Sequence, residues 1–356
     1  MAPPHPRRPI AKDRFAALFP TLKVQTYHDP ASRGPGSHTI RTIAWNPTGH
    51  LIATGSADRT LRIWNPEKPQ VKNSTELRGH TGGIERVAWN PTKEAELASV
   101  SSDGTCRFWD VRSKTCTATV QLGGEGLTIS WAADGSAVMV GRKVRSLSPH
   151  LPLRNTSPSR SSANILPTHQ DDTLVPITIY PTPTAQPSHA PALQTNQCTF
   201  NHTSPPSHLL LTRGDGSVTI ASYPSLQTLH TLHAHTSSCL SLALSPTSRY
   251  LAIGGSDALI SLYDTTDWVC KRTLTNLTGA VKSVGFSFDG SFVVGGSDEG
   301  NVLEVAHTES GEYVGKVDIG ASGGCGVVAW HPGRYWIAWA GEGAGLKILG
   351  AAGGQL

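Results

Sequence analysis

The chain repeats one short pattern at an almost constant spacing, and this repeat limits the folds available to it. The segments "IRTIAWNPTGHLIATGSADRTLRIWN" (40–65) and "IERVAWNPTKEAELASVSSDGTCRFWD" (84–110) each contain three short apolar runs separated by turn residues. An aromatic residue or Leu closes the first run of every copy: Trp45, Trp89, Trp131, Phe200, Leu244, Phe286 and Trp330. The spacings between these residues are 44, 42, 69, 44, 42 and 44. Such a period indicates an array of like units rather than two unrelated domains.

A period of about 40–45 residues with four short strands per copy is typical of the WD40 β-propeller. We therefore predict an all-β fold, a seven-bladed WD40 β-propeller, over residues 37–350. The seventh copy shows three strands and ends with "GLKILG" (345–350), so we expect its fourth strand from "TLKVQTY" (21–27) in the N-terminal arm, residues 1–36. This N-terminal strand would close the ring and remove the last exposed strand edges. Residues 351–356 are assigned to a tail.

The one irregular spacing exceeds 42 by 27 residues, which is the length of segment 144–170. This segment holds six Ser, four Pro and three Arg but no acidic or aromatic residue, so we predict a disordered insertion within blade three. It could be a loop that accepts phosphate at its two Ser-Pro pairs or simply a tolerated loop. A third hypothesis is a retained intron of 81 nucleotides, since Val144-Arg145 can be encoded GTACGT, Ala163-Asn164 GCTAAC and Gln170 CAG. These codons match splice-donor, branch-point and acceptor sequences, and we favour this origin.

Composition excludes several classes of function. The chain carries 30 basic and 26 acidic residues, which gives a net charge of only +4. A protein that binds nucleic acid through its charge usually has a denser basic patch. Six Cys without a CxxC motif predict buried free thiols in a reducing compartment. No window approaches 18 apolar residues, and the N-terminus lacks the apolar core of a secretory signal. We therefore expect no membrane span, metal site, cofactor or small-molecule substrate.

Blade two contains a set of polar residues that predicts a structural hydrogen-bond network. The set is His80, Ser99, Asp103 and Trp109, with Thr54, Asp58 and Trp64 as the partial set in blade one and His235 and Asp257 in blade five. We expect the Trp indole to bond to the Ser hydroxyl, and the hydroxyl to connect through His to Asp. Ser, His and Asp also form hydrolase triads, but here the set recurs at blade positions without a nucleophile elbow. A propeller enzyme would also need converging carboxylates or a metal at its channel, so we predict a non-catalytic protein.

Two further features concern partners. Residues in the turn into the first strand or in the Asp-containing turn are candidates for a partner-docking rim: Arg41, Arg59, Glu85, Arg86, Arg213 and Lys282. The alternative for each is an ordinary solvated charge. The string "WDVR" (109–112) matches the WDxR pattern of substrate receptors for cullin-type ubiquitin ligases. This match indicates an alternative function, that of a substrate receptor for such a ligase.

A set of longer strings resembles a narrower family. They are "WDVRSKTC" (109–116), "DGSVTIASYPSL" (215–226), "GSDALISLYD" (255–264), "DWVCKRTL" (267–274) and "AWHP" (329–332). In this order they are similar to the THO complex subunit 3 family, the WD-repeat subunit of the THO/TREX assembly. Removing 144–170 also restores "GRKDDTLV", which is similar to the "G-x-K-D-D" turn of that family.

The resemblance implies a scaffold subunit in the nucleus that couples transcription to mRNA processing and export by protein–protein docking. Its implied partners are the other THO/TREX subunits, with RNA contacted only indirectly or weakly. The segments 29–38 and 181–194 depart from the family pattern, so contacts made there do not follow from the resemblance.

Overall fold

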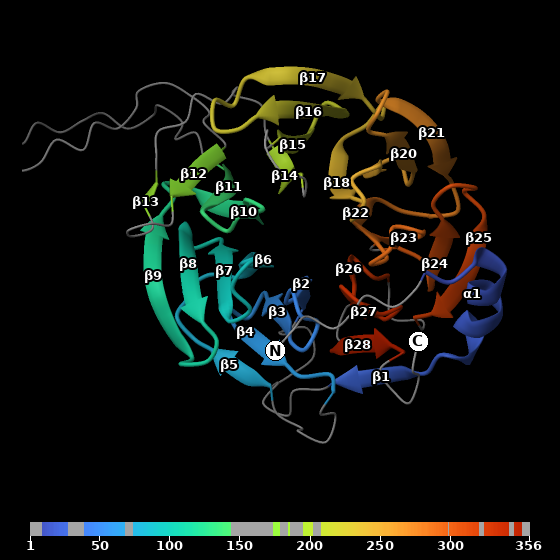
Figure 1. Cartoon of the computed structure of the whole chain (residues 1–356). Coiled ribbons are helices and arrows are strands. Elements are labelled where there is room, and N and C mark those ends of the chain that lie inside the picture. The colour runs from blue at the N-terminus through green and yellow to red at the C-terminus, as the bar shows by residue number, and fades with distance from the viewer. Residues whose placement is uncertain are drawn as a thin grey trace, which may run out of the picture.

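The structure is a ring of four-stranded antiparallel sheets (Figure 1). This computed structural model describes residues 9–27, 39–67, 74–143, 174–178, 184–185, 195–201, 208–297, 299–319, 324–341 and 345–350. The described strands form seven such sheets, and six of them are built from consecutive strands. The seventh combines strands from both ends of the chain.

The first three sheets follow one another along the chain. The first contains β2 (Ile40–Trp45), β3 (Ile52–Ser56), β4 (Leu61–Trp64) and β5 (Thr75–Leu77). The second contains β6 (Ile84–Trp89), β7 (Glu96–Ser101), β8 (Thr105–Asp110) and β9 (Thr115–Gln121). The third contains β10 (Glu125–Trp131), β11 (Ala137–Lys143), β12 (Leu174–Thr178) and β13 (Thr184–Ala185).

The remaining sheets complete the ring. The fourth contains β14 (Thr195–Phe200), β15 (His208–Arg213), β16 (Ser217–Ser222) and β17 (Thr228–His233), and the fifth β18 (Cys239–Leu244), β19 (Tyr250–Gly255), β20 (Ile260–Asp264) and β21 (Val269–Leu274). The sixth contains β22 (Val281–Phe286), β23 (Phe292–Ser297), β24 (Val302–His307) and β25 (Tyr313–Asp318). The last contains β26 (Val327–Trp330), β27 (Ile337–Ala340), β28 (Leu346–Leu349) and the N-terminal β1 (Val24–Tyr27).

Burial explains why these strands do not alternate strictly between apolar and polar residues. All five residues of β3 and all six of β23 are buried, because a neighbouring sheet covers each face. Five of the six residues in the outer strands β17 and β21 are exposed. The apolar core therefore lies between the sheets, in a series of clusters that each join side chains from adjacent sheets.

The seven inner strands surround the axis, and each contacts the inner strand of the next sheet, including β26 with β2 (Figure 1). Indole N–H groups join three of these junctions. Trp45, Trp89 and Trp131 donate to the carbonyl oxygens of Ala329, Ala44 and Ala88 in the preceding sheet, at 3.3, 2.9 and 2.9 Å. The residues that mark the sequence repeat are thus also inter-sheet contacts.

The N-terminal strand expected over 21–27 spans Val24–Tyr27 and pairs antiparallel with β28, with Val24 opposite Leu349. The Tyr27 hydroxyl donates to the carbonyl of Pro66 at 3.1 Å, just beyond the first sheet. Its ring lies edge-on to Trp64. The N-terminal segment therefore belongs to the last sheet and contacts the first.

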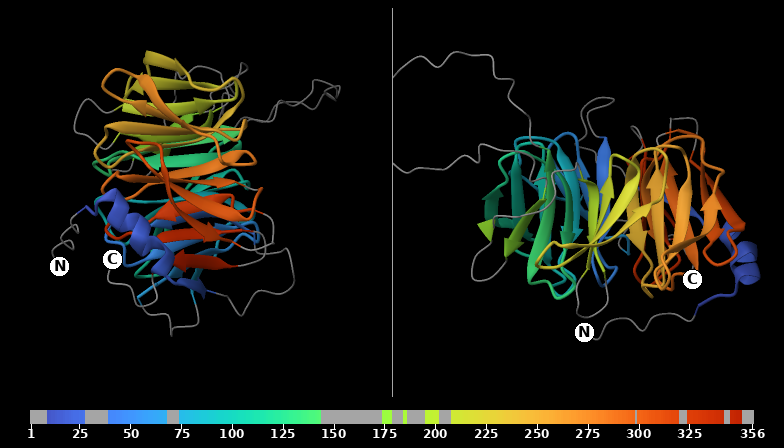
Figure 2. Two further views of the ribbon diagram at one scale, coloured as in Figure 1. Left: turned by 90° about the vertical axis from the view of Figure 1, so that its right-hand side faces the viewer. Right: turned by 90° about the horizontal axis from the view of Figure 1, so that it is seen from above.

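The N-terminal segment also contains a short helix that the all-β expectation did not include. It consists of α1 (Lys12–Leu18) followed by the 3-10 turn η1 (Phe19–Thr21), and α1 lies on the outer circumference beside β25 (Figure 2). Phe15 stacks on Phe292 with ring centroids 3.8 Å apart, and both Phe15 and Phe19 are 2% exposed. The helix is held by these two aromatic side chains in the cluster between the sixth and seventh sheets.

The predicted insertion 144–170 lies outside the described residues, as do the tail 351–356 and residues 1–8. The strands on either side of the insertion are described. β11 and β12 pair antiparallel, with Gly141 opposite Leu174. The flanking strands are therefore neighbours in one sheet.

Candidate docking surfaces

The blade-two network joins His80, Ser99, Asp103 and Trp109, the four residues for which the repeat predicts it. The indole Nε1 of Trp109 donates to Ser99 Oγ at 2.8 Å, and Ser99 Oγ lies 2.7 Å from His80 Nε2. His80 Nδ1 lies 2.9 Å from Asp103 Oδ2. The side chain of His80 is fully buried and that of Asp103 is 5% exposed. The relay ties β7, β8 and the turn before β6 into one unit.

The protonation of this network follows from its burial. Burial lowers the pKa of His80, although the Asp103 carboxylate opposes that shift. Burial alone would raise the pKa of Asp103, but hydrogen bonds from Thr105, the Thr81 amide and His80 outweigh it and hold the pKa well below its usual range. Ser99 is 0% exposed and its oxygen already accepts the indole N–H. No substrate can reach that hydroxyl, so the arrangement is structural rather than a hydrolase triad.

Blades one and five keep parts of the network. Trp64 Nε1 donates to Thr54 Oγ1 at 2.9 Å, while Asp58 instead accepts the backbone N–H of Thr60 at 3.0 Å. Asp58, which we expected to join Thr54 and Trp64 in one network, lies in the turn between β3 and β4.

In blade five, His235 Nδ1 lies 3.0 Å from Asp257 Oδ2, and its Nε2 faces the Ile253 carbonyl at 3.2 Å. That carbonyl takes the place of the Ser99 hydroxyl in blade two. The blade-one bond thus joins β3 to β4, and the blade-five contacts hold the turn before β18 against β19.

Six inner strands carry a β-bulge near their start, which the sequence did not predict. The residues left out of the pairing register are Arg41, Glu85, Leu127, Asn196, Leu240 and Lys282. None of them is buried. A bulged residue is unpaired and re-aims its side chain, so these six form a bulge ring at one end of the inner strands. The only sequence signal is their common position, four residues before the aromatic or Leu marker.

Four of the predicted rim residues meet at this end of the ring. Arg41, Glu85, Arg86 and Lys282 line a pocket of about 420 Å³, which we call the mouth pocket. Its other lining residues are Thr39, Ile40, Leu127, Gly324, Gly326, Val327, Ala340 and Gly341. Arg41 and Glu85 form an ion pair, with side chains 42% and 23% exposed. Burial raises the pKa of Glu85, and the two arginines partly oppose that shift.

The other two rim candidates lie elsewhere. Arg59 is exposed in the turn between β3 and β4, outside the residues that line the mouth pocket. Arg213 is 1% exposed and donates from Nη1 to Thr195 Oγ1 at 2.9 Å, so its prediction as a docking residue is wrong. Its side chain lies back against β14 and β16, where burial lowers the pKa of the guanidinium.

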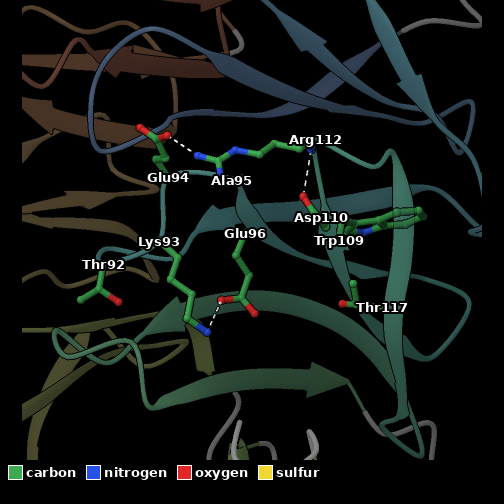
Figure 3. Close-up of a pocket in the computed structure, with 9 residues that line it drawn as sticks. All are labelled: Thr92, Lys93, Glu94, Ala95, Glu96, Trp109, Asp110, Arg112 and Thr117. Carbon is green, nitrogen blue, oxygen red and sulfur yellow. Dashed lines mark hydrogen bonds and ion pairs between the residues drawn. The ribbon is translucent and has the colours of Figure 1, made fainter. Parts of the chain in front are cut away.

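A second pocket, of about 500 Å³, lies at the opposite end of blade two, because it is formed by the turn before β7 and the end of β8 (Figure 3). Arg112 of the "WDVR" string contacts Glu94 there and is 71% exposed. Its backbone N–H donates to Asp110 Oδ1 at 2.9 Å. Lys93 pairs with Glu96 at 3.2 Å across the same pocket. The Arg112 side chain is thus accessible to a partner.

Within the described part of the chain, no group of three or more His, Cys, Asp or Glu residues is placed to hold a metal ion. No helix among the described residues is long and apolar enough to cross a membrane. Charged side chains are among the residues that line both pockets.

The fold and these surfaces define a WD-repeat β-propeller with charged pockets at both ends of its sheets. The family described as "WD domain, G-beta repeat" matches residues 29–65, 71–110, 226–264 and 268–303. A solved structure, the Cps50 (Swd1) β-propeller domain of Myceliophthora thermophila, superposes with a TM-score of 0.70 at 16% identity, covering 92% of this chain and 99% of that one. This similarity concerns the fold.

Two similar proteins indicate a narrower family within the WD-repeat proteins. THO complex subunit 3 of Arabidopsis thaliana is 32% identical over 326 residues, which cover 90% of this chain and 92% of the relative. WD repeat-containing protein AAC3 of Dictyostelium discoideum is 26% identical over 272 residues, 70% of this chain and 51% of that protein. The chain belongs to the THO complex subunit 3 family.

Proposed function

We propose that the chain is a non-catalytic scaffold subunit of a THO/TREX assembly in the nucleus, where it helps couple transcription to mRNA processing and export. The observation that carries this proposal is the similarity to THO complex subunit 3, which extends over nearly the whole length of both chains. Its partners would be the other protein subunits of the assembly, with RNA contacted indirectly or weakly.

The proposed mechanism is rigid display of charged side chains by a closed ring. We infer seven blades closed by the N-terminal strand, which is supported by the pairing of β1 with β28 and by the contact of β26 with β2. The backbone of such a ring need not reorder when a partner binds, so the positions from which these side chains extend are preorganised. The mouth pocket residues are the first candidates for docking.

Affinity purification from nuclear extract tests the proposal. The full chain, tagged at its C-terminus, should recover the other THO subunits, as identified by mass spectrometry. The tagged propeller of an unrelated WD-repeat protein provides the control. Recovery of no THO subunit by the full chain, under conditions that preserve the assembly, would contradict the proposal.

An alternative function, a substrate receptor for a cullin-type ubiquitin ligase, is supported by the exposure of Arg112 in its "WDVR" string. Arg112→Ala should then abolish binding to the ligase adaptor while leaving the fold intact, because only a surface ion pair with Glu94 is lost. Arg78→Ala, which removes another exposed arginine, is the control. If Arg112→Ala retains every partner, the alternative is excluded.

We propose the domain boundaries as in the sequence: an arm over 1–36, a propeller over 37–350 interrupted by 144–170, and a tail over 351–356. We also propose that 144–170 is encoded by a retained intron. Transcript reads across the site provide the test. If every mature message contains the 81 nucleotides, the intron hypothesis is wrong.

A further inference from the structure

The mouth pocket contains more positive than negative charge. Among the described residues that line it, Arg41, Arg86 and Lys282 are cations and Glu85 is the one carboxylate. Glu85 already contacts Arg41, and the nearby carboxylate of Glu125 contributes to raising its pKa. The single carboxylate thus has two guanidinium groups beside it.

Arg86 occupies a position that serves a structural purpose in other blades. Three residues before the aromatic or Leu marker, the other blades carry Thr42, Thr128, Gln197 or Ser283, and the side-chain oxygen there accepts a backbone N–H from the next blade. These donors are Val87, Cys198, Leu242 and Val328, at 3.2, 3.3, 3.2 and 3.3 Å. A guanidinium has no acceptor atom, so Arg86 cannot make this bond to the third blade. Blade two therefore carries a charge at a position where four other blades carry an inter-blade hydrogen-bond acceptor.

Arg86 is also in an unfavourable place for a charge. Burial lowers its pKa, and its charge interacts with Glu85 and with Cys198, which lies two blades away in β14. Arg86 is half-buried in the lining of the mouth pocket, next to Glu85. Removing a charge from water is costly unless the charge is paired, so a further carboxylate beside this half-buried guanidinium would be favourable.

We propose that the mouth pocket binds an acidic peptide segment of a partner protein, with a carboxylate of that segment paired to Arg86. Arg41 and Lys282 provide further cations at the pocket wall, while Leu127 and Val327 provide apolar contact for an adjacent side chain. The proposal rests on the proposed function, because it identifies the kind of segment that a THO subunit would place there.

The pocket fits a peptide better than a nucleic acid. Single-stranded nucleic acid is held by aromatic side chains on which bases stack and by an extended basic groove. The described lining residues of the mouth pocket include no aromatic side chain, and Glu85 would repel a phosphate backbone. A short segment that supplies one or two carboxylates next to an apolar side chain matches the lining.

Arg86→Thr separates binding from stability. Threonine at this position restores the side-chain oxygen that Thr42 and Thr128 provide in other blades, so the variant should unfold at the same or a higher temperature than the wild type. Loss of a charge-assisted pair should weaken binding of the acidic segment about tenfold or more. Arg78→Ala, an exposed arginine outside the pocket lining, should leave binding unchanged.

The assay uses the full chain and overlapping peptides that tile every THO subunit, printed as an array and followed by fluorescence anisotropy on the spots that bind. The expected result is at least one net-acidic peptide that binds wild-type protein and Arg78→Ala but not Arg86→Thr. No such peptide, or equal binding by Arg86→Thr, overturns the inference. A labelled single-stranded oligonucleotide is titrated in parallel, and Arg86-dependent binding of it instead of a peptide also overturns it. If affinity purification still recovers THO subunits in these cases, the proposed function stands without this site.

Discussion

Ser99 shows how one hydroxyl can stabilise a whole blade. Its oxygen accepts the Trp109 indole N–H and lies within hydrogen-bond distance of His80, so it satisfies two buried polar groups from different elements. Both neighbours are nearly inaccessible to water, with Trp109 1% and His80 7% exposed. Buried polar groups that lose their partner cost far more than exposed ones.

Ser99→Ala should therefore lower the free energy of unfolding by roughly 2–4 kcal/mol, since two buried groups each lose a partner. Urea denaturation followed by Trp fluorescence measures the change. Thr54→Ser in blade one is the matched control, because it keeps the hydroxyl that accepts from Trp64 and loses one methyl group, worth about 1 kcal/mol. Equal losses in the two variants would show that the hydroxyl network contributes little.

The same network predicts how stability depends on pH. Burial lowers the pKa of His80 below its usual 6.5, so the unfolded chain binds this proton more readily and stability should fall as the pH drops below about 6.5. The pKa of Asp103 also lies below its usual 3.8, so its contribution is present above that value and is lost at lower pH. His80→Gln should flatten the upper part of this profile, measured as urea midpoints from about pH 8 to about pH 4. An unchanged slope in the variant would contradict the assignment.

Sequence patterns predicted the residues that recur at fixed blade positions better than those at the surface. His80, Ser99, Asp103 and Trp109 could be found because the repeat defines their places. Arg213 could not be placed correctly, because whether an Arg in an Asp-containing turn faces solvent or packs against Thr195 depends on the neighbouring strands. Arg86 is a predicted rim charge, but only the structure shows that the residues at its position in other blades accept inter-blade hydrogen bonds.

At the scale of elements, the hairpins between the second and third strands follow one rule. Five residues separate the last paired positions in five sheets, for example Gly55 and Leu61 or Val100 and Cys106. An Asp at the third loop position accepts the backbone N–H two residues later in four of them, at Asp58, Asp103, Asp215 and Asp257. In the third sheet, 32 residues lie between Gly141 and Leu174. Without 144–170, five would remain, with Asp171 third.

Deleting 144–170 should therefore give a folded protein that is more stable by roughly 1.6 kcal/mol, since closing a loop of five residues costs less entropy than closing one of 32. Thermal unfolding of the deletion variant and the full chain measures this difference. The same deletion combined with Asp171→Ala removes the turn acceptor and should be about 1 kcal/mol less stable than the deletion alone. A deletion variant that is insoluble or less stable than the full chain would show that the segment supports the fold.

The strand elements were predictable because they recur seven times, whereas α1 occurs once and spans seven residues. Nothing in the repeat refers to it, and a helix this short is stabilised by tertiary contacts rather than by its own propensity. Phe15 and Phe19 supply those contacts by inserting between the sixth and seventh sheets. The spacing of the repeat could not show that the sixth and seventh sheets would offer a surface for these two side chains.

At the scale of the whole molecule, the last sheet, which contains strands from both ends of the chain, meets the first sheet at a junction that we call the seam. Tyr27 lies on β1, in the last sheet, yet its hydroxyl bonds to Pro66 and its ring packs against Trp64 in the first. Burial raises the pKa of this hydroxyl to about 12, so it remains a donor throughout the physiological range. This residue connects both sides of the seam.

Tyr27→Ala should lower the free energy of unfolding by about 3–5 kcal/mol, the usual cost of truncating a buried aromatic residue. Hydrogen exchange read by mass spectrometry should show faster exchange in both β28 and β4, on the two sides of the seam. Tyr27→Phe, which loses only the hydroxyl, should cost about 1 kcal/mol. Faster exchange confined to β1 would show that the seam does not depend on this side chain.

The bulge ring has a consequence for how such a protein can evolve. Because each bulged residue lies outside the pairing register of its strand, its side chain is not constrained by cross-strand packing. Arg41, Glu85 and Lys282 can therefore drift by mutation while the sheets that carry them stay the same. A lineage could therefore change the side chains at this end of the ring as its partner changes, one position per blade, and every intermediate sequence would still fold.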